Sequence, residues 1–176
     1  MWHVDEMKVK TNGKWLWLWN IMDADTRFLL SSLVSKKREV KDARRIFQKA
    51  KTIAKNKPEI VVSDGLPAYT RAFKKEFYTM RKPRTEHIQK PRFFDPTNNN
   101  IVERLNGTIR EREKVMRGTK ELQTIADGMR NYYNFIRAHQ SPDGKTPAEV
   151  ANINLNLGKN KWLSLIKQAS KSAPKN

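Results

Sequence analysis

Three strand-like segments follow one another within the first 35 residues, and this opening constrains the fold more than any other feature. Residues 2–9 mix apolar and polar side chains, whereas residues 15–22 are almost wholly apolar, as in a strand covered on both faces. Asn12-Gly13 between them is a strong hairpin signal, and a turn after residue 22 leads into a third strand over 27–35. The sequence therefore predicts a three-strand antiparallel meander.

After the meander, strands alternate with helical patterns. Apolar residues recur every three or four positions within 36–57, which indicates an amphipathic helix. The elements expected next are a short strand over 59–63, a helix from Pro67 to Phe77, a weak strand over 85–89, a loop over 91–99, a long helix beginning within 98–100 and a helix over 120–139. This order predicts an α/β fold in which parallel strands join the meander and helices cover both faces. The ribonuclease H-like layout is one candidate among several.

The chain is strongly basic, with 36 Lys and Arg against 18 Asp and Glu and a formal net charge of +18. A thermostable surface would carry matching acids, so the excess points to a polyanion such as DNA or RNA. With no Cys the chain has neither disulfides nor a thiolate zinc site, and it has no apolar run long enough for a membrane helix. We expect a core over residues 1–151 and a basic tail over 152–176, which has five Lys and no acid.

Three acids stand out by position. Asp5 interrupts the first strand, Asp64 ends the strand over 59–63, and Glu103 lies in the long helix on the side away from its apolar stripe. Taken singly, each is more often a turn, a cap or a solvated charge. Together, two carboxylates on adjacent strands and a third on a helix would hold two Mg²⁺ ions and support in-line phosphoryl displacement.

The text around these acids resembles the DDE transposases of bacterial and archaeal insertion sequences of the IS-six/IS-two-forty type, within the retroviral-integrase-like superfamily. The resemblance covers about residues 2–151. The segments that carry it are Trp2-His3-Val4-Asp5-Glu6, Ser63-Asp64-Gly65-Leu66-Pro67, Glu86-His87, Asn99-Asn100-Ile101-Val102-Glu103-Arg104-Leu105-Asn106-Gly107-Thr108-Ile109-Arg110-Glu111-Arg112, Met116-Arg117-Gly118 and Asn131-Tyr132-Tyr133-Asn134-Phe135-Ile136-Arg137-Ala138-His139.

The resemblance implies a ribonuclease H-like fold and cleavage at element ends followed by transfer of a 3′-hydroxyl into target DNA. It implies that Asp5, Asp64 and Glu103 are the catalytic, metal-binding triad for two Mg²⁺ or Mn²⁺ ions. The residues that it assigns to phosphate or DNA contact are Arg110, Asn106, His87, Arg104 and Arg112. It further implies a homo-oligomer on DNA, cytoplasmic and without membrane association.

The sequence departs from this pattern in two places. Thirty-eight residues separate Asp64 from Glu103, slightly more than is usual for this type, so we expect a longer loop around 91–99 than in relatives. The first strand follows Met1 directly, so we expect a catalytic domain without the helical DNA-binding segment that precedes it in relatives. Two alternatives stay open: an inactive, truncated remnant that only binds DNA non-specifically, and a ribonuclease H-like nuclease or resolvase.

Other notable residues have structural interpretations. The three tryptophans within 15–19 share one strand face and are predicted to lie in the core. Asn98 to Asn100 are predicted to cap the long helix. Arg137 and His139, although they belong to a family-like segment, are predicted to pack or to hydrogen-bond within the fold.

Overall fold

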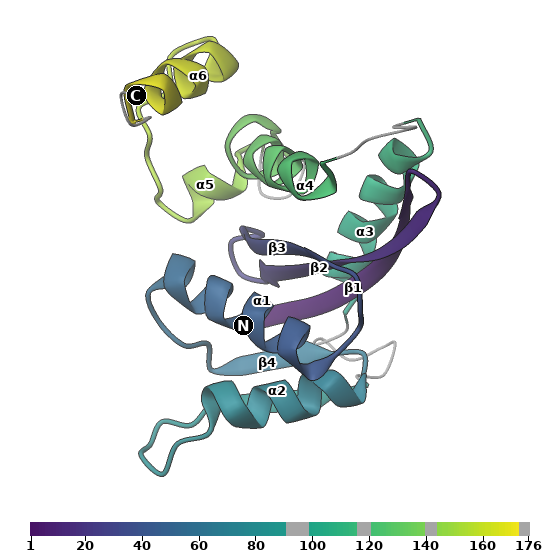
Figure 1. Ribbon diagram of the computed structural model, residues 1–176. Helices are drawn as coiled ribbons and strands as arrows, with labels where there is room; N and C mark the ends of the chain where they lie inside the picture. Colours follow the sequence, from purple (N-terminus) through teal and green to yellow (C-terminus); the bar gives the residue numbers. More distant parts are fainter. Residues whose placement is uncertain (91–98, 116–120, 140–143, 173–176) are drawn as a thin grey trace.

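The computed structural model describes residues 1–90, 99–115, 121–139 and 144–172 (Figure 1). A five-stranded mixed sheet with the order β3-β2-β1-β4-β5 forms its centre. The strands are β1 (Trp2–Thr11), β2 (Lys14–Asp23), β3 (Leu29–Ser35), β4 (Ile60–Ser63) and β5 (Glu86–Gln89). The first three are antiparallel, and β4 and β5 continue the sheet parallel to β1. The predicted meander and its parallel extension are confirmed.

The β1–β2 hairpin closes at the turn that the sequence predicts. Asn12 and Gly13 both have positive φ, 47° and 73°, between the paired residues Thr11 and Lys14. Two successive residues of positive φ form a type I′ turn, whose twist matches that of the flanking strands. The turn fixes the register of β1 against β2.

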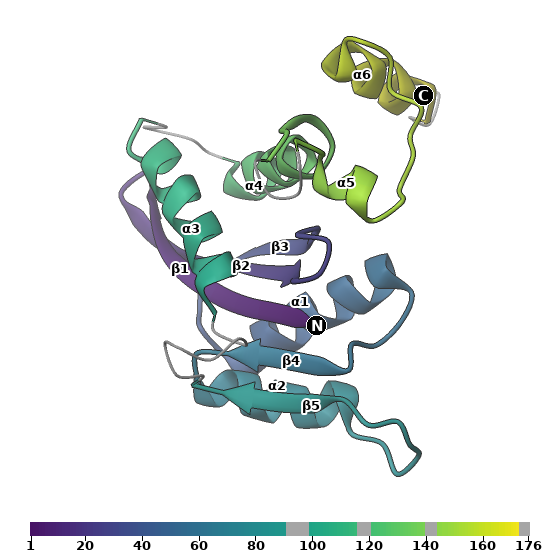
Figure 2. The same cartoon turned by 180° about the vertical axis from the view of Figure 1, so that it is seen from behind.

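Helices cover both faces of the sheet. One face carries α1 (Val40–Ala54) and α2 (Pro67–Phe77). The other carries α3 (Asn100–Glu113), α4 (Leu122–Asn131) and the π-helical turn η1 (Tyr132–Ile136), as Figure 2 shows from behind. The short α5 (Pro147–Val150) follows, and α6 (Lys161–Ser172) ends the described chain, where its Trp162 ring stacks on the Tyr132 ring of η1 at 6.1 Å. No helix in the described ranges is long and apolar enough to cross a membrane.

Each face of the sheet has its own apolar core. On the α1–α2 face, the Tyr69 ring meets the Trp19 ring edge-on at 5.5 Å, and the Phe47 and Phe77 rings meet likewise at 5.3 Å. On the α3–α4 face, β2 packs against Leu105 and Ile109 of α3. Because the middle of the sheet is covered on both sides, the site described below rests on a fixed frame.

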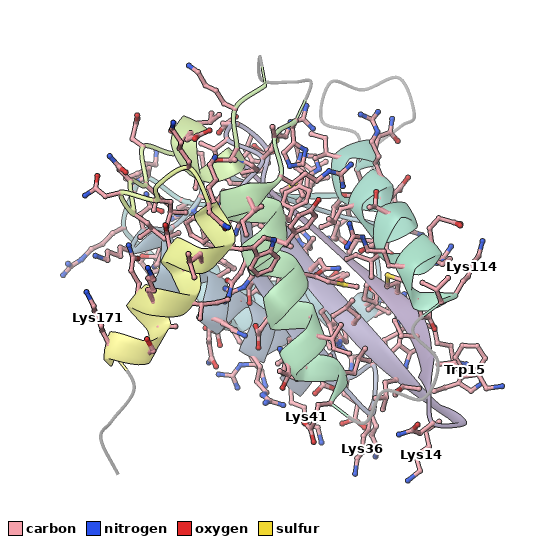
Figure 3. All side chains as sticks on the ribbon, turned by 90° about the horizontal axis from the view of Figure 1, so that it is seen from above. Lys14, Trp15, Lys36, Lys41, Lys114 and Lys171 are labelled. Carbon is pink, nitrogen blue, oxygen red and sulfur yellow. The ribbon has the colours of Figure 1, made fainter. Side chains whose placement is uncertain are left out.

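Two details differ from the sequence prediction. Trp15 is 54% exposed rather than buried, because it lies at the tip of the hairpin (Figure 3), where the Nζ atoms of Lys8 and Lys10 lie over its ring. The third strand begins at Leu29 rather than at Arg27, since Arg27 has a left-handed backbone with φ 62°. Within the segment expected to be a basic tail, residues 161–172 form the helix α6. Residues 91–98 of the loop expected over 91–99, and the segment 116–118, lie outside the described residues.

Candidate active site

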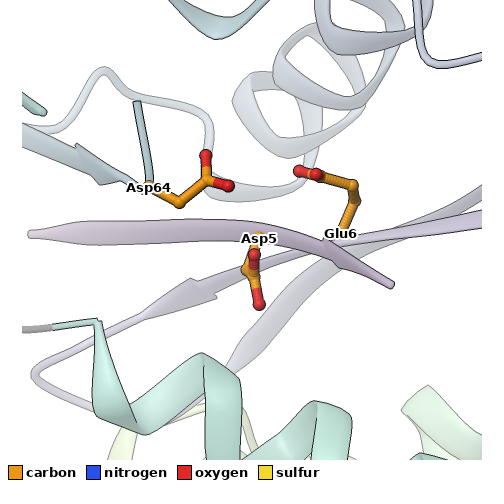
Figure 4. Close-up of side chains that lie close together, drawn as sticks. All are labelled: Asp5, Glu6 and Asp64. Atoms are coloured by element: carbon orange, nitrogen blue, oxygen red, sulfur yellow. The ribbon is translucent and has the colours of Figure 1, made fainter. Parts of the chain in front are cut away.

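Asp5 and Asp64 are neighbours because of the register between two parallel strands. Val4 of β1 pairs with Ser63, the last residue of β4, so the next residues along the two strands are Asp5 and Asp64. Carboxylate oxygens of Asp5, Asp64 and Glu6 all lie within 4.8 Å of one another (Figure 4). The structure thus brings together two of the three acids expected from the sequence.

Asp5 points toward α3, and a chain of buried amides holds it there (Figure 4). Asn106 of α3 donates from Nδ2 to Asp5 Oδ2 at 2.7 Å. Asn20 of β2 donates to Asn106 Oδ1 at 2.8 Å, and the Ser32 hydroxyl of β3 donates to Asn20 Oδ1 at 2.7 Å. All three donors are at most 5% exposed, so the network fixes one orientation of the Asp5 carboxylate. Asn106 is thus a buried hydrogen-bond partner of Asp5, and its contact with phosphate stays a prediction.

Glu6 is the member of the cluster that the sequence reasoning missed. It follows Asp5 on β1 and therefore points to the opposite side of the sheet (Figure 4). Its two carboxylate oxygens accept from the Arg38 guanidinium and from the Tyr69 hydroxyl. Arg38 Nη2 also lies 3.6 Å from Asp64 Oδ2. A second acid beside Asp5 in the first strand was the available signal; Arg38 and Tyr69 gave none.

The turn after β4 positions Asp64. Its Oδ1 accepts from the Leu66 backbone N–H at 2.9 Å, and α2 begins at Pro67 immediately afterwards. Gly65 between them has φ +91°, and a Cβ at that position would lie 2.5 Å from Lys90 Cγ. Only glycine adopts this conformation without strain, so the turn that positions Asp64 requires Gly65.

The electrostatics of the cluster favour a bound cation. Burial, with the nearby charges of Glu6 and Asp64, raises the pKa of Asp5 to about 7, although the Asn106 hydrogen bond opposes the shift. Burial also raises the pKa of Glu6, helped by Asp64 and opposed by Tyr69 and Arg38. Crowded carboxylate oxygens are the ligands that Mg²⁺ and Mn²⁺ prefer, and a divalent cation would relieve their repulsion. The residues present therefore fit a divalent metal.

Glu103 lies in the first turn of α3 and is exposed; its backbone N–H donates to the Asn99 carbonyl at 3.2 Å. It is not among the carboxylates within 4.8 Å of one another. Glu103 and Asn106 are three residues apart, so both side chains leave the helix on the flank that faces Asp5. Arg110, also exposed, lies one turn beyond Asn106 on the same flank.

Asn99 differs from its predicted role as a helix cap. Its side chain makes no capping bond. Instead, Asn99 Oδ1 lies 3.1 Å from His3 Nδ1, and its Nδ2 donates to the Val4 carbonyl at 3.3 Å. These bonds attach the start of α3 to β1 beside Asp5. Asn98 lies outside the described residues.

The three other residues expected to contact DNA, His87, Arg112 and Arg104, differ in how far they are engaged within the fold. The His87 ring stacks on Phe73 at 4.6 Å and bonds the Ser63 hydroxyl at 3.0 Å, and burial lowers its pKa to about 4. It is therefore neutral and engaged within the fold. The Arg112 guanidinium lies 5.0 Å from the centre of the Tyr132 ring, and Arg104 is exposed on the far flank of α3.

Comparisons with known proteins identify the family of the chain and the solved structures that share its fold. A family model described as a DDE domain, for transposases of the IS-two-forty type, matches residues 1–141. A comparison with curated proteins finds no match. Among solved structures, the HTLV-2 integrase catalytic core domain in complex with magnesium has a TM-score of 0.63 at 17% identity, over 85% of this chain and 93% of that chain. The catalytic core domain of BIV integrase has a TM-score of 0.55 at 14% identity, over 98% and 97%.

A chain of the simian T-cell lymphotropic virus intasome, solved with the B56 gamma subunit, has a TM-score of 0.61 at 16% identity. It is matched over 85% of this chain and 52% of its own length, so the present chain spans about half of it. At these identities the likeness establishes the fold, which is ribonuclease H-like as the sequence predicts. With a family model over most of its length, the chain belongs to the DDE-domain family of transposases.

Proposed function

We propose that this protein cleaves DNA strands and transfers them by metal-dependent chemistry on the acids Asp5, Asp64 and Glu103. The observation that carries the proposal is the juxtaposition of Asp5 and Asp64 at the same level of two parallel strands, with their oxygens within 4.8 Å. A buried amide network orients Asp5, and a glycine of positive φ lies beside Asp64. Acids that were only solvated surface charges would not need such support, so the arrangement favours a functional site.

The roles of the residues follow from their positions. Asp5 and Asp64 would hold Mg²⁺ or Mn²⁺ through carboxylate oxygens, and Glu103, exposed on the facing flank of α3, would complete the site for a second ion. Bound metal supplies Lewis acidity at the scissile phosphate and lowers the pKa of the attacking hydroxyl. Arg110, on the flank of α3 that carries Glu103, would hold a phosphate oxygen.

The substrate proposed is DNA, both element ends and target, because the chain belongs to a family of transposases and its net charge of +18 favours a polyanionic partner. Residues 1–151 would carry the chemistry, and 152–176 would add a basic segment. We further propose a homo-oligomer on DNA, since the HTLV-2 integrase core was solved in dimeric and trimeric forms. As a DNA-acting protein it would work in the cytoplasm.

Metal binding tests the site without depending on element ends. We expect Mn²⁺ and Mg²⁺ to raise the melting temperature of the wild-type protein saturably, because they bind only the folded state. Asp64→Asn and Glu103→Gln should reduce this response. Glu111→Gln, which removes an exposed acid elsewhere on α3, is the matched control and should retain it. Equal metal responses in Asp64→Asn and wild type would contradict the site.

Substrate choice separates the alternatives. Strand transfer of supplied insertion-sequence ends, lost in Asp64→Asn, supports transposase chemistry. Cleavage confined to RNA–DNA hybrid or to four-way junctions would instead indicate a nuclease or resolvase. Metal-independent DNA binding with no cleavage of any substrate would indicate an inactive remnant.

A further inference from the structure

A cavity of about 540 Å³ on the α3–α4 side is lined by three arginines, of which only Arg104 was expected from the sequence to contact DNA. Arg27 comes from the β2–β3 connection, Arg104 from α3, and Arg137 from the segment just after η1. Thr108 and Tyr133 add hydroxyl groups to the lining. Three separate segments thus bring cationic and hydrogen-bonding groups to one hollow.

No carboxylate in the described ranges forms an ion pair with Arg27, Arg104 or Arg137. Arg27 and Arg137 are half-buried, so their charges are only partly screened by water. Their convergence also acts on a common neighbour. Burial raises the pKa of the Tyr133 phenol, while Arg27, Arg137 and Arg104 each oppose the shift. Like charges gathered around one cavity repel, and a bound anion removes that repulsion.

The backbone at Arg27 is a second, independent observation. Its φ of 62° lies in the left-handed region, which Gly and Asn adopt far more readily than arginine. Strain of this kind persists where the surrounding structure fixes it, often at binding sites. Here the strained residue lines the cavity.

We propose that this cavity, the arginine cavity, binds a phosphate of the DNA backbone. Guanidinium groups match a phosphate with paired, directed hydrogen bonds, which a diffuse lysine surface does not provide. Arg104 and Thr108 are each two residues from Asn106, about 160° away around α3. The cavity therefore lies on the opposite flank of the helix from Asp5 and would anchor DNA without touching the metal ligands. This inference rests on the proposed function in that DNA is the substrate.

The test measures DNA affinity without metal. Fluorescence anisotropy with a random-sequence duplex, in EDTA and across a salt series, is run in an Asp64→Asn background so that cleavage cannot contribute. Arg27→Asn, which suits the left-handed backbone, Arg104→Gln, at an exposed position, and Arg137→Gln should each weaken binding about 5- to 10-fold and lower the salt slope by about 1. Arg104→Lys should recover only part of the loss, because it restores charge without the planar fork.

Arg45→Gln is the matched control, since it removes an exposed positive charge from α1 on the other face of the sheet. It should weaken binding less than about 2-fold if a specific cavity rather than total charge is responsible. An Arg45→Gln effect equal to that of Arg104→Gln would overturn the proposal, as would unchanged affinity in all three cavity variants.

Inorganic phosphate at matched ionic strength distinguishes the source of the anion. Binding of free phosphate that Arg104→Gln abolishes, with duplex affinity unaffected by that variant, would show a small-anion site and overturn DNA binding. Because metal is absent throughout, failure here leaves the metal-shift test of the proposed function unaffected. Conversely, loss of metal binding would not explain a selective effect of the cavity variants.

Discussion

Replacing Asp5 by asparagine should stabilise the protein in the absence of metal, although it removes a metal ligand. Asp5 is partly buried beside Glu6 and Asp64, and its pKa is raised from 3.8 to about 7. Keeping it charged in the folded state therefore costs about 4 kcal/mol at most. The amide that replaces the carboxylate retains an oxygen that can accept from Asn106, so the amide network should survive the change.

The sign of the pH dependence follows from the raised pKa. The folded state binds the Asp5 proton more tightly than the unfolded chain, so wild-type stability falls as the pH rises from about 4 to about 7. Asp5→Asn removes this contribution. Because Asp5 is partly exposed and its neighbours can relax, we expect a gain of about 1–3 kcal/mol at about pH 8, or roughly 2–10 °C in melting temperature.

The assay is thermal unfolding of Asp5→Asn and wild type in EDTA, from about pH 4.5 to about pH 8.5. The difference in melting temperature should be near zero at the acidic end and grow toward the alkaline end. Added Mg²⁺ should then close the gap by stabilising only the wild type. A variant less stable than wild type at the alkaline end, or a gain independent of pH, would refute the carboxylate crowding on which the argument rests.

Two further substitutions test the residues that support the carboxylate cluster. Arg38→Met should lower the free energy of unfolding by about 2–4 kcal/mol, because Glu6 would stay buried without its counter-charge. Urea unfolding should show that the double variant with Glu6→Gln recovers most of this loss. A double variant as unstable as Arg38→Met alone would contradict the pairing. Gly65→Ala should destabilise by about 1–2 kcal/mol through its positive φ and weaken the Mn²⁺-induced thermal shift, whereas the control Gly107→Ala, in open space on α3, should be neutral or stabilising. Equal effects of the two alanines would show that the turn is not constrained.

Periodicity and turn chemistry in the sequence were sufficient to predict the sheet. The Asn12-Gly13 signal, the apolar second strand and the start of α2 at Pro67 are local features, and each is found where expected. The juxtaposition of Asp5 and Asp64 was also predictable, since two acids at the ends of paired segments meet when the strands are parallel. The exposure of Trp15 at the hairpin tip was not predictable. The alternation of side chains along a strand shows which face of the sheet a residue lies on, but not how far along the strand the helices cover that face.

The contacts that complete the site could not be predicted, because they join residues far apart in the chain. Asn20 contacts Asn106, 86 residues away, and Tyr69 contacts Glu6, 63 residues away. Neither pair has a local pattern, since a buried asparagine and an exposed one look alike in sequence. The arginine cavity is similar: Arg27, Arg104 and Arg137 come from three segments and converge only in the folded chain.

The partners of the clustered acids indicate which of them serve a metal. Glu6 has both oxygens occupied, one by the cationic Arg38 and the other by Tyr69, so its charge is already compensated. Among the described residues, Asp5 receives only neutral donors, the Asn106 amide and the Glu6 backbone, which orient the carboxylate without cancelling its charge. An oriented but uncompensated carboxylate suits a cation that binds from solution, whereas a neutralised one suits a fixed scaffold. This difference favours Asp5 over Glu6 as a metal ligand, and Glu6 as the residue that fixes Arg38 and Tyr69 of α2 behind it.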